Sequence, residues 1–336
     1  MYPHVTILIP TKNVVNYVDD VIQSLLNLDY PEESIDIVIL DAYSTDGTIE
    51  ALSKYPVKII QENCNPPTAY NPMIEQVKGG VIAFGDGDAI VDKNWLKSLV
   101  RHLDDPEIAG VGGLCSTAND DKLIPRIIGY ELQDRYERMP ENISRIATMN
   151  VIFKKTALQE VGGFDEELDT SYDAEVGHKI TRSGYNIRFD KEAIVYHHHR
   201  SDLVSFFKQQ YTYGTNIPKM YLKNWDMAKG DEVTSLWMNL QPFLFTLIGI
   251  LLLTSPFLKR SLILATGLII VIGSIYFASA VRLSYKFKDL AALFLVVIYL
   301  TRSIAWTFGG VRCTLTLIKN KFGKMVQSID LRGGVV

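Results

Sequence analysis

The sequence predicts a mixed α/β domain followed by a helical membrane region. Residues 5–196 alternate short β-rich runs with longer segments of helical periodicity, which is the pattern of a parallel or mixed sheet with flanking helices. Apolar residues concentrate after Ser235, in segments long enough to cross a bilayer as helices. Acidic residues follow two of the predicted strands, at the edge where open α/β sheets bind ligands. Together these observations indicate a ligand-binding domain attached to a membrane.

Strands and helices alternate in the amino-terminal part of the chain. A helix is predicted over residues 17–28, where apolar residues recur at helical spacing before Tyr30-Pro31 ends the pattern. A second helix opens at Asp46-Gly47-Thr48, where Asp46 is explained by capping. Short runs of aliphatic residues predict core strands at residues 5–9, 35–40, 57–60 and 81–84, with a later strand at 193–196.

Composition excludes some classes of protein. The chain has 34 basic and 38 acidic residues and a formal net charge of −4, which argues against a nucleic-acid binder that depends on phosphate attraction. Cys64, Cys115 and Cys313 have neither metal-ligand spacing nor a disulfide framework, as expected in a reducing cytoplasm. No apolar run precedes the first predicted strand, so we expect no signal peptide and no secretion of the amino-terminal domain.

The composition of the carboxyl-terminal part indicates a membrane-associated region. Residues 201–234 mix aromatic side chains with lysines, as interfacial amphipathic helices do, although a peripheral helix packed on the amino-terminal domain would look similar. Residues 235–318 are predicted to hold transmembrane helices, with buried soluble helices as the alternative. Arg302 interrupts the third apolar segment, so a tilted, re-entrant or interfacial helix competes with a full span there. The three apolar segments lie at about 240–258, 262–281 and 290–310.

Charge near these segments does not decide the topology, because Lys259-Arg260, the loop with Arg282, Lys286 and Lys288, and the tail at residues 319–336 are all basic. We place the amino-terminal domain and the middle loop in the cytoplasm, and predict a multi-pass protein of the cytoplasmic or inner membrane.

The triplet Asp86-Gly87-Asp88 follows the strand at residues 81–84. Side chains two residues apart on a strand share a face, so both carboxylates can bind one hard cation, and such a cation suits a diphosphate. Ordinary turn chemistry is the alternative explanation of the triplet. Asp41 ends another predicted strand and points into the expected ligand crevice, where it could accept hydrogen bonds from a nucleoside.

Several separated motifs together resemble one known family. Over about residues 3–215, their order and spacing resemble the inverting family 2 glycosyltransferases of the GT-A fold. The resemblance implies a Rossmann-like nucleotide-sugar-binding domain, which we assign to residues 1–200. The motifs are Pro10-Thr11-Lys12-Asn13, residues 41–48, Asp86-Gly87-Asp88, residues 150–153, Val161-Gly162-Gly163-Phe164-Asp165, and Tyr172-Asp173-Ala174-Glu175.

The resemblance assigns donor-side roles. Asp41 matches the nucleoside-binding acid, with Pro10 and Thr11 shaping the opposite wall, and Asn13 is a further expected donor-binding residue. Asn71 stands where relatives keep an Asn near the nucleotide, although Asn-Pro is also an ordinary turn. Asp86 and Asp88 match the motif that binds a divalent cation and through it the donor, and carboxylates suit Mg²⁺ or Mn²⁺. His197, the first of three consecutive histidines, is the expected further metal contact.

On the acceptor side, Asp173 matches the catalytic base, which removes a proton from the acceptor hydroxyl. Tyr172 stands where the family usually has Glu. Glu175 is either a fallback base or a capping acid. Gly162 and Gly163 allow backbone approach to the acceptor or form a tight turn. Gly162, Gly163, Tyr172 and Glu175 are the expected acceptor-binding residues beside Asp173.

The predicted reaction is inverting transfer of a sugar from a nucleotide-diphosphate sugar, by default a UDP-sugar, to a hydroxyl of a polyprenyl-linked saccharide, for cell-surface polysaccharide or protein glycosylation. A phosphate acceptor is already ionised and needs no base, so Asp173 favours a hydroxyl. The alternatives are a polyprenyl-phosphate glycosyl synthase and a non-catalytic nucleotide-sugar-binding subunit. Thr212 stands where relatives often have Arg, which argues against a processive polymerase.

Overall fold

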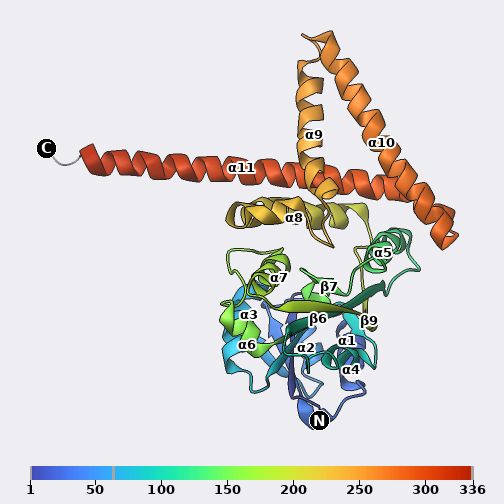
Figure 1. The fold of residues 1–336 in the computed structure, drawn as a ribbon, viewed down its shortest axis with the longest axis vertical. Helices are drawn as coiled ribbons and strands as arrows, with labels where there is room; N and C mark the ends of the chain where they lie inside the picture. The colour runs from blue at the N-terminus through green and yellow to red at the C-terminus, as the bar shows by residue number, and fades with distance from the viewer. Residues whose placement is uncertain (1, 63–64, 334–336) are drawn as a thin grey trace.

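In the computed structural model, the chain forms an amino-terminal sheet domain and a carboxyl-terminal helical region (Figure 1). The structure describes residues 2–62 and 65–333, with side chains through residue 321. Helices α8 (Leu203–Lys223) and α11 (Leu295–Gly333) lie across one end of the sheet domain. The hairpin of α9 (Leu236–Thr254) and α10 (Lys259–Phe287) projects away from it. The predicted α/β domain followed by apolar helices is confirmed.

A nine-stranded mixed sheet forms the centre of the domain. The four predicted core strands are present as β1 to β4, and β1, β2, β3 and β4 pair in parallel in the order β3-β2-β1-β4. The sheet continues through β8, β6, β9 and β5, and β8 runs antiparallel to β4 and β6. The strands are Val5–Thr11, Ile35–Asp41, Lys58–Gln61, Val81–Phe84, Ala89–Val91, Ile108–Thr117, Asn142–Ile143, Val151–Lys154 and Asn186–His197 for β1 to β9.

Helices cover both faces of the sheet. Alternation along β1 sends Ile7 and Ile9 toward α1 (Val18–Leu26) and α4 (Trp95–Val100), and Leu8 toward α3 (Pro66–Gln76), α6 (Lys155–Glu160) and α7 (Tyr172–Arg182). The side chain of Trp95 is fully buried and donates a hydrogen bond to Asn150. The remaining helices of the domain are α2 (Thr48–Leu52), α5 (Leu123–Tyr136) and the short 3₁₀ turns Glu32–Ser34 and Thr148–Asn150.

Parallel pairing of the strands brings the expected ligand-binding residues to one edge of the sheet. The register of β1 with β2 sets Thr11 beside Asp41, and β4 lies on the other side of β1, so the residues after all three strands meet at one edge.

Of the described cysteines, Cys115 and Cys313 are free and buried, while Cys64 lies outside the described residues.

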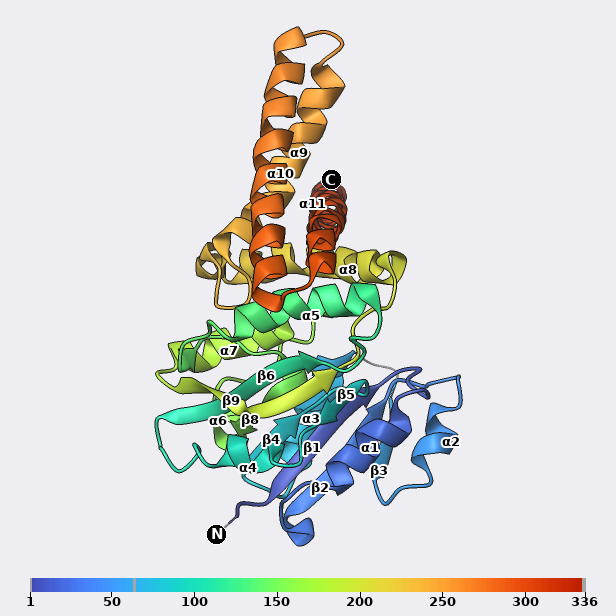
Figure 2. The ribbon, with the colours of Figure 1, turned by 90° about the vertical axis from the view of Figure 1, so that its right-hand side faces the viewer.

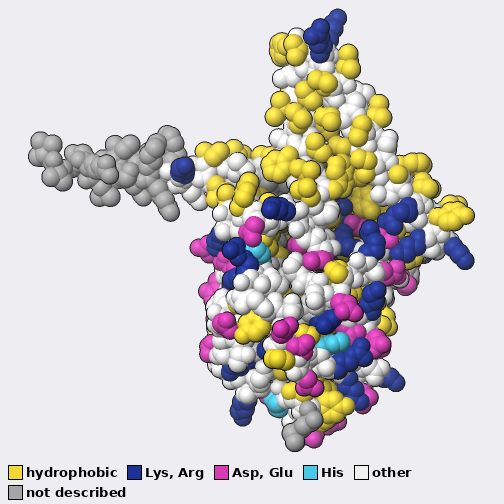
Figure 3. Space-filling model, in the orientation of Figure 1, with side chains coloured by type: hydrophobic (Ala, Val, Ile, Leu, Met, Phe, Trp, Pro, Cys, Tyr) yellow, Lys and Arg dark blue, Asp and Glu magenta, His cyan; other side chains and the backbone are white. Residues whose placement is uncertain are grey.

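The apolar segments form three helices long and apolar enough to cross a membrane, Leu236–Thr254, Lys259–Phe287 and Leu290–Lys321. The third combines the short 3₁₀ turn Leu290–Phe294 with the described start of α11. Figure 2 shows α11 nearly end-on at the base of the hairpin, so α11 runs across the hairpin and not along it. Figure 3 shows hydrophobic side chains over the hairpin and charged ones over the sheet domain.

Helix α8 packs along α11. A Cβ atom added to Gly214 would lie 2.6 Å from the backbone of Trp306, so only glycine fits this crossing. Trp306 Nε1 also donates to Gln210 of α8 at 2.9 Å. Arg302, which interrupts the third apolar segment, is 6% exposed and pairs with Glu131 of α5 at 2.7 Å. The charge in this segment therefore faces protein, as charges within apolar helices usually do.

Candidate functional site

Asp86, Asp88 and His197 form a cluster that could hold a metal ion. The two acids lie in the turn between β4 and β5, and antiparallel pairing of β5 with β9 sets Ala89 opposite His197. One potential ligand atom from each of the three side chains lies within 4.8 Å of the others, and His197 Nε2 is 3.2 Å from Asp88 Oδ1. Two carboxylates and an imidazole are a donor set that suits Mn²⁺ or Mg²⁺.

Burial makes this cluster electrostatically strained. Burial, with the charge of Asp88, raises the pKa of Asp86 to about 6. Burial would also raise the pKa of Asp88, but the adjacent His197 outweighs it and lowers that pKa. The pKa of His197 is raised, because Asp88 and Asp86 outweigh the effect of burial. A divalent cation would relieve the repulsion between the two carboxylates.

Asp41 lies at the end of β2 and is 1% exposed. It accepts hydrogen bonds from Thr11 Oγ1 at 3.1 Å and Gln61 Nε2 at 3.1 Å, and from both the backbone N–H and the hydroxyl of Ser44. Burial would raise the pKa of Asp41, but these hydrogen bonds lower it. They already fill the accepting capacity of a carboxylate, about four bonds. Its nucleoside-binding role stays a prediction, and a nucleoside would have to replace one of these donors.

The loop after β1 is joined to the loop after β2. Asn13 has a positive φ of 55° and accepts the backbone N–H of Thr45 at 2.8 Å. The backbone N–H of Asn13 in turn donates to Ser44. The structure therefore brings Pro10, Thr11, Asn13 and Asp41 to one edge of the sheet, and Pro10 faces the central cavity described below.

Asn71 acts as a clamp between α3 and the loop at residues 163–166. Its side chain accepts from the backbone N–H of Phe164 and donates to the carbonyl of the same residue, both at 2.9 Å. Gly163 has φ +67°, and a Cβ atom there would lie 2.4 Å from Asn71 Oδ1. Gly162, with φ +75°, forms the same turn. None of these three residues lines the central cavity.

Asp173 lies in the first turn of α7 and faces the cavity. Two nitrogens of Arg145, Nε and Nη2, each lie 3.3 Å from Asp173 Oδ2. The third, Nη1, donates to Thr234 Oγ1 at 3.0 Å and lies 3.4 Å from Asp231 Oδ2. Burial would lower the pKa of Arg145, but Asp173 and Asp231 raise it. Within the described chain, Asp173 Oδ1 has no hydrogen-bond partner, so one oxygen is free to accept a proton.

Arg145 is the functional residue that sequence reasoning missed. It lies two residues after the two-residue strand β7, in the loop before β8, and no motif or spacing in the sequence marks it. Its position beside Asp173 follows only from folding that loop against residues 231–234, which connect α8 to α9.

Glu175 lies away from the cavity. It is 6% exposed and pairs with Lys179 at 3.2 Å, and burial raises its pKa despite that lysine. Tyr172 does line the cavity and packs edge-on against Tyr70 and Phe164, with ring centroids 6.3 and 5.9 Å apart. Of the two acids in this motif, the structure brings only Asp173 to the cavity.

One cavity of about 450 Å³ connects these groups. It extends from the metal cluster and Asp173 to the undersides of α8 and α11, and Arg200 also lines it. Its far wall is largely apolar, formed in part by Phe206, Ile217, Met238 and Trp306. The arrangement offers a cation site, a carboxylate and an apolar wall facing one space.

Comparison with known proteins assigns part of the chain to a family. The model of the family Glycosyl transferase family 2 matches residues 6–162. Glycosyltransferase AglE of Haloferax volcanii is 26% identical over 58% of this chain and 67% of its own length. A Methanococcus voltae dolichyl N-acetyl-glucosaminyl phosphate diacetamido-dideoxy-glucuronosyltransferase is 23% identical over 74% of this chain and 81% of its own.

The fold also matches a solved structure. A mannosyltransferase from Pyrobaculum calidifontis in complex with GDP-Man and Mn²⁺ superposes with a TM-score of 0.62 at 18% identity, over 94% of this chain and 88% of that one. The pre-mycofactocin glycosyltransferase of Mycobacterium tuberculosis is 22% identical, and the match spans 48% of its length. The chain is thus a glycosyltransferase whose residues 6–162 form a family 2 domain of the GT-A fold.

Proposed function

We propose that this protein transfers a sugar, with inversion, from a nucleotide-diphosphate sugar to a hydroxyl of a polyprenyl-linked saccharide. The observation that carries the proposal is the single cavity that joins the Asp86, Asp88 and His197 cluster to Asp173 and continues to the base of the apolar helices. A donor at the cation site and a lipid-linked acceptor entering from the helices would meet beside Asp173. The name of one relative, the Methanococcus voltae transferase that acts on a dolichyl-linked sugar, supports this acceptor class.

Each side chain has a task that its position supports. A divalent cation held by Asp86, Asp88 and His197 would act as a Lewis acid on the leaving diphosphate. Asp173 Oδ1 takes the proton of the acceptor hydroxyl, whose oxygen attacks the anomeric carbon on the face opposite the diphosphate. Arg145 holds Oδ2, which orients the carboxylate. Arg200 lines the same cavity and can contact a donor phosphate.

We further propose that α9 and α10 cross the cytoplasmic membrane and that α11 lies at its surface. The exposed apolar side chains of the hairpin include Phe243, Leu253, Phe257 and Ile270. The buried face of α11 packs on α8, and its opposite face is apolar. This arrangement would leave the catalytic cavity on one side of the membrane, and we propose that this side is the cytoplasm.

The test is donor turnover by purified full-length protein in detergent, with a panel of UDP- and GDP-sugars, Mn²⁺, Mg²⁺ or chelator, and membrane lipid extract as acceptor. Metal-dependent labelling of the lipid fraction by one donor is expected. Labelling of a water-soluble glycan in preference to lipid would contradict the acceptor class. Absence of turnover with every donor and metal, together with unchanged donor binding in Asp86→Ala, would support a non-catalytic role instead.

A further inference from the structure

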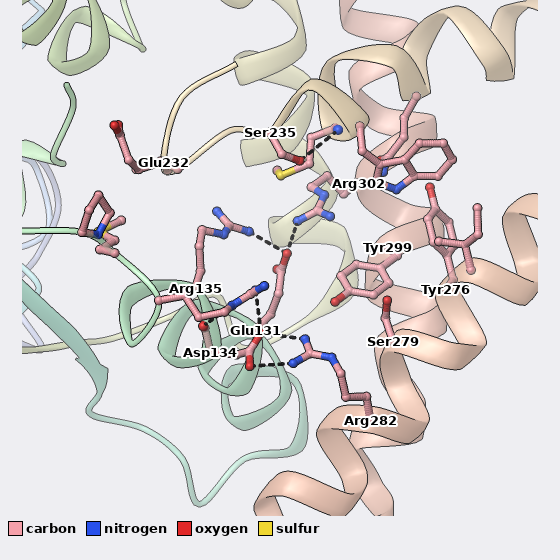
Figure 4. A pocket seen from close by; sticks show the side chains of 18 residues that line it. Glu131, Asp134, Arg135, Glu232, Ser235, Tyr276, Ser279, Arg282, Tyr299 and Arg302 are labelled. Atoms are coloured by element: carbon pink, nitrogen blue, oxygen red, sulfur yellow. Dashed lines mark hydrogen bonds and ion pairs between the residues drawn. The ribbon is translucent and has the colours of Figure 1, made fainter. Parts of the chain in front are cut away.

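A second, larger cleft lies where α5 of the sheet domain meets α9, α10 and α11 (Figure 4). Its volume is about 720 Å³. It shares Glu131, Arg135 and Arg302 with the central cavity, so the two spaces adjoin along these side chains. None of the residues assigned to catalysis or metal binding lines it.

The cleft is rich in cations. Asp134 pairs with two of them, Arg138 and Arg282, and with Lys286 next to the cleft, at 2.7 to 2.9 Å. Glu131 pairs with two more, Arg135 at 2.6 Å and Arg302 at 2.7 Å. Figure 4 shows these arginines converging on Glu131 and Asp134 from α5, α10 and α11.

Two further acidic side chains near the cleft do not neutralise its excess of positive charge. Glu137 also accepts from Lys286, and Glu232 on the far rim is hydrogen-bonded to Ser144. With these two included, the cations still outnumber the carboxylates. An anionic group could therefore bind here without displacing every internal ion pair.

Arg302 lines the cleft and carries one buried donor without a partner in the described part of the chain. Its side chain is 6% exposed, and its Nε has no hydrogen-bond partner among the described residues. Since this Nε is shielded from solvent, an anionic oxygen in the cleft would bind the outer N–H groups of the guanidinium. Because Arg302 lines both spaces, a group bound to it would sit at the boundary with the catalytic cavity.

The cleft lies beside apolar surface. On α10, Ile275 lines the cleft and is 39% exposed, and Phe277 nearby is 58% exposed. Leu240 of α9 is 44% exposed. A hydrocarbon chain lying along these helices would bring its polar end to the arginines, as lipid headgroups meet basic side chains between apolar helices.

We infer that this cleft binds the phosphate or diphosphate of the polyprenyl acceptor, with Arg138, Arg282 and Arg302 as its ligands. The inference rests on the proposed function and adds to it a headgroup site separate from the catalytic cavity. The lipid enters between α9, α10 and the sheet domain, its phosphate stays on the arginines, and the attached saccharide extends past Arg302 toward Asp173. The position of the cleft thereby limits how far the acceptor hydroxyl extends toward Asp173.

The experiment measures binding of a synthetic polyprenyl diphosphate to full-length protein in dodecyl maltoside. Arg282→Gln and Arg138→Gln are the test variants, because both side chains are more than half exposed and the second leaves the contacts of α10 intact. Arg260→Gln, at the opposite end of α10, is the matched control. Binding of nucleoside diphosphate with Mn²⁺ checks that each variant is folded.

Affinity for the polyprenyl diphosphate should fall about tenfold in each test variant, the size of one lost charge-assisted hydrogen bond, with nucleotide binding and the Arg260→Gln control unchanged. Equal affinity in all variants overturns the inference. Displacement of the lipid by an equal concentration of inorganic diphosphate, or by phosphatidylglycerol micelles, also overturns it, since the ligand would then be free diphosphate or any anionic lipid.

The same variants separate this inference from the proposed reaction. If sugar transfer to lipid-linked acceptor occurs and the variants bind lipid normally, the headgroup site fails and the reaction stands. If lipid binding depends on the arginines but no donor sugar reaches any lipid acceptor, the reaction fails and the site stands.

Discussion

Asp173 and Glu175 lie two residues apart in one helix, and only Asp173 faces the cavity. We expect Asp173→Asn to lower kcat by about 10²- to 10⁴-fold, the usual contribution of a general base, because the amide keeps the size of the side chain but cannot take a proton. Affinity for the donor should change little. Radiolabelled transfer and donor titration measure the two effects.

Glu175→Gln is the matched control for this experiment. Its acid is paired with Lys179 away from the cavity, so we expect turnover within a few fold of wild type. Full activity in Asp173→Asn, or an equal loss in Glu175→Gln, would contradict the assignment of the base.

Asp86 links stability to pH and metal. Its pKa is raised to about 6 by burial and by Asp88. A carboxyl group with a raised pKa contributes stability that is complete below its unfolded pKa, about 3.8, and is lost as the pH rises through about 6. Without metal, this group should therefore make the protein more stable at about pH 5 than at about pH 7.5.

Mn²⁺ should reverse that trend, because it binds the ionised carboxylates. The shift in Tm caused by Mn²⁺ is expected to be larger at about pH 7.5 than at about pH 5, and Asp86→Asn should abolish most of the difference. Scanning fluorimetry with Mn²⁺ or chelator measures it. A metal-induced shift independent of pH in the wild type would count against this site.

At the scale of elements, the crossing of α8 and α11 depends on close backbone approach. A methyl group at Gly214 would meet the backbone of Trp306 at 2.6 Å, whereas one at Gly249 of α9 meets nothing within 4 Å. Gly to Ala inside a helix normally stabilises it by about 1 kcal/mol. Gly249→Ala should thus be neutral or stabilising, while Gly214→Ala should destabilise by about 1 to 3 kcal/mol through overpacking.

Thermal unfolding in detergent distinguishes the two substitutions. Because α8 also forms part of the cavity wall through Phe206 and Ile217, Gly214→Ala is expected to reduce turnover as well. If both alanine variants unfold at the same temperature as wild type, the crossing is looser than the structure shows.

For the whole molecule, the arrangement of the helices makes a prediction about topology. The carboxyl-terminal end of α10, where Lys286 pairs with Asp134, lies beside the sheet domain. The turn between α9 and α10 lies far from that domain, and α11 runs across the base of the hairpin (Figure 1). In cells, a cysteine introduced at Arg260 should be labelled only from outside. Cysteines at Lys288 and Lys319 should be labelled only from the cytoplasm.

The background for this experiment replaces Cys64, Cys115 and Cys313 with serine. Labelling at Lys319 from outside would mean that α11 crosses the membrane. Labelling at Arg260 from the cytoplasm would mean that the hairpin does not.

The sequence alone determined the domain order, the parallel core strands and the family. These rest on local patterns: aliphatic runs such as residues 81–84 form strands because they must be buried, and acids directly after such strands reach the ligand edge. The cluster of Asp86, Asp88 and His197 was predictable for the same reason, since two of its members are neighbours in sequence. The apolar helices followed from length and hydropathy.

Only the tertiary structure decided which predicted residues share one space. Asn71, Gly162 and Gly163 belong to motifs of the family, yet long-range packing makes them a clamp outside the cavity. Arg145 reaches Asp173 because two loops distant in sequence fold together. Arg302, an interruption in an apolar segment, is buried against Glu131 because an ion pair offsets the cost of its burial. Such contacts depend on three-dimensional proximity, which local sequence patterns do not encode.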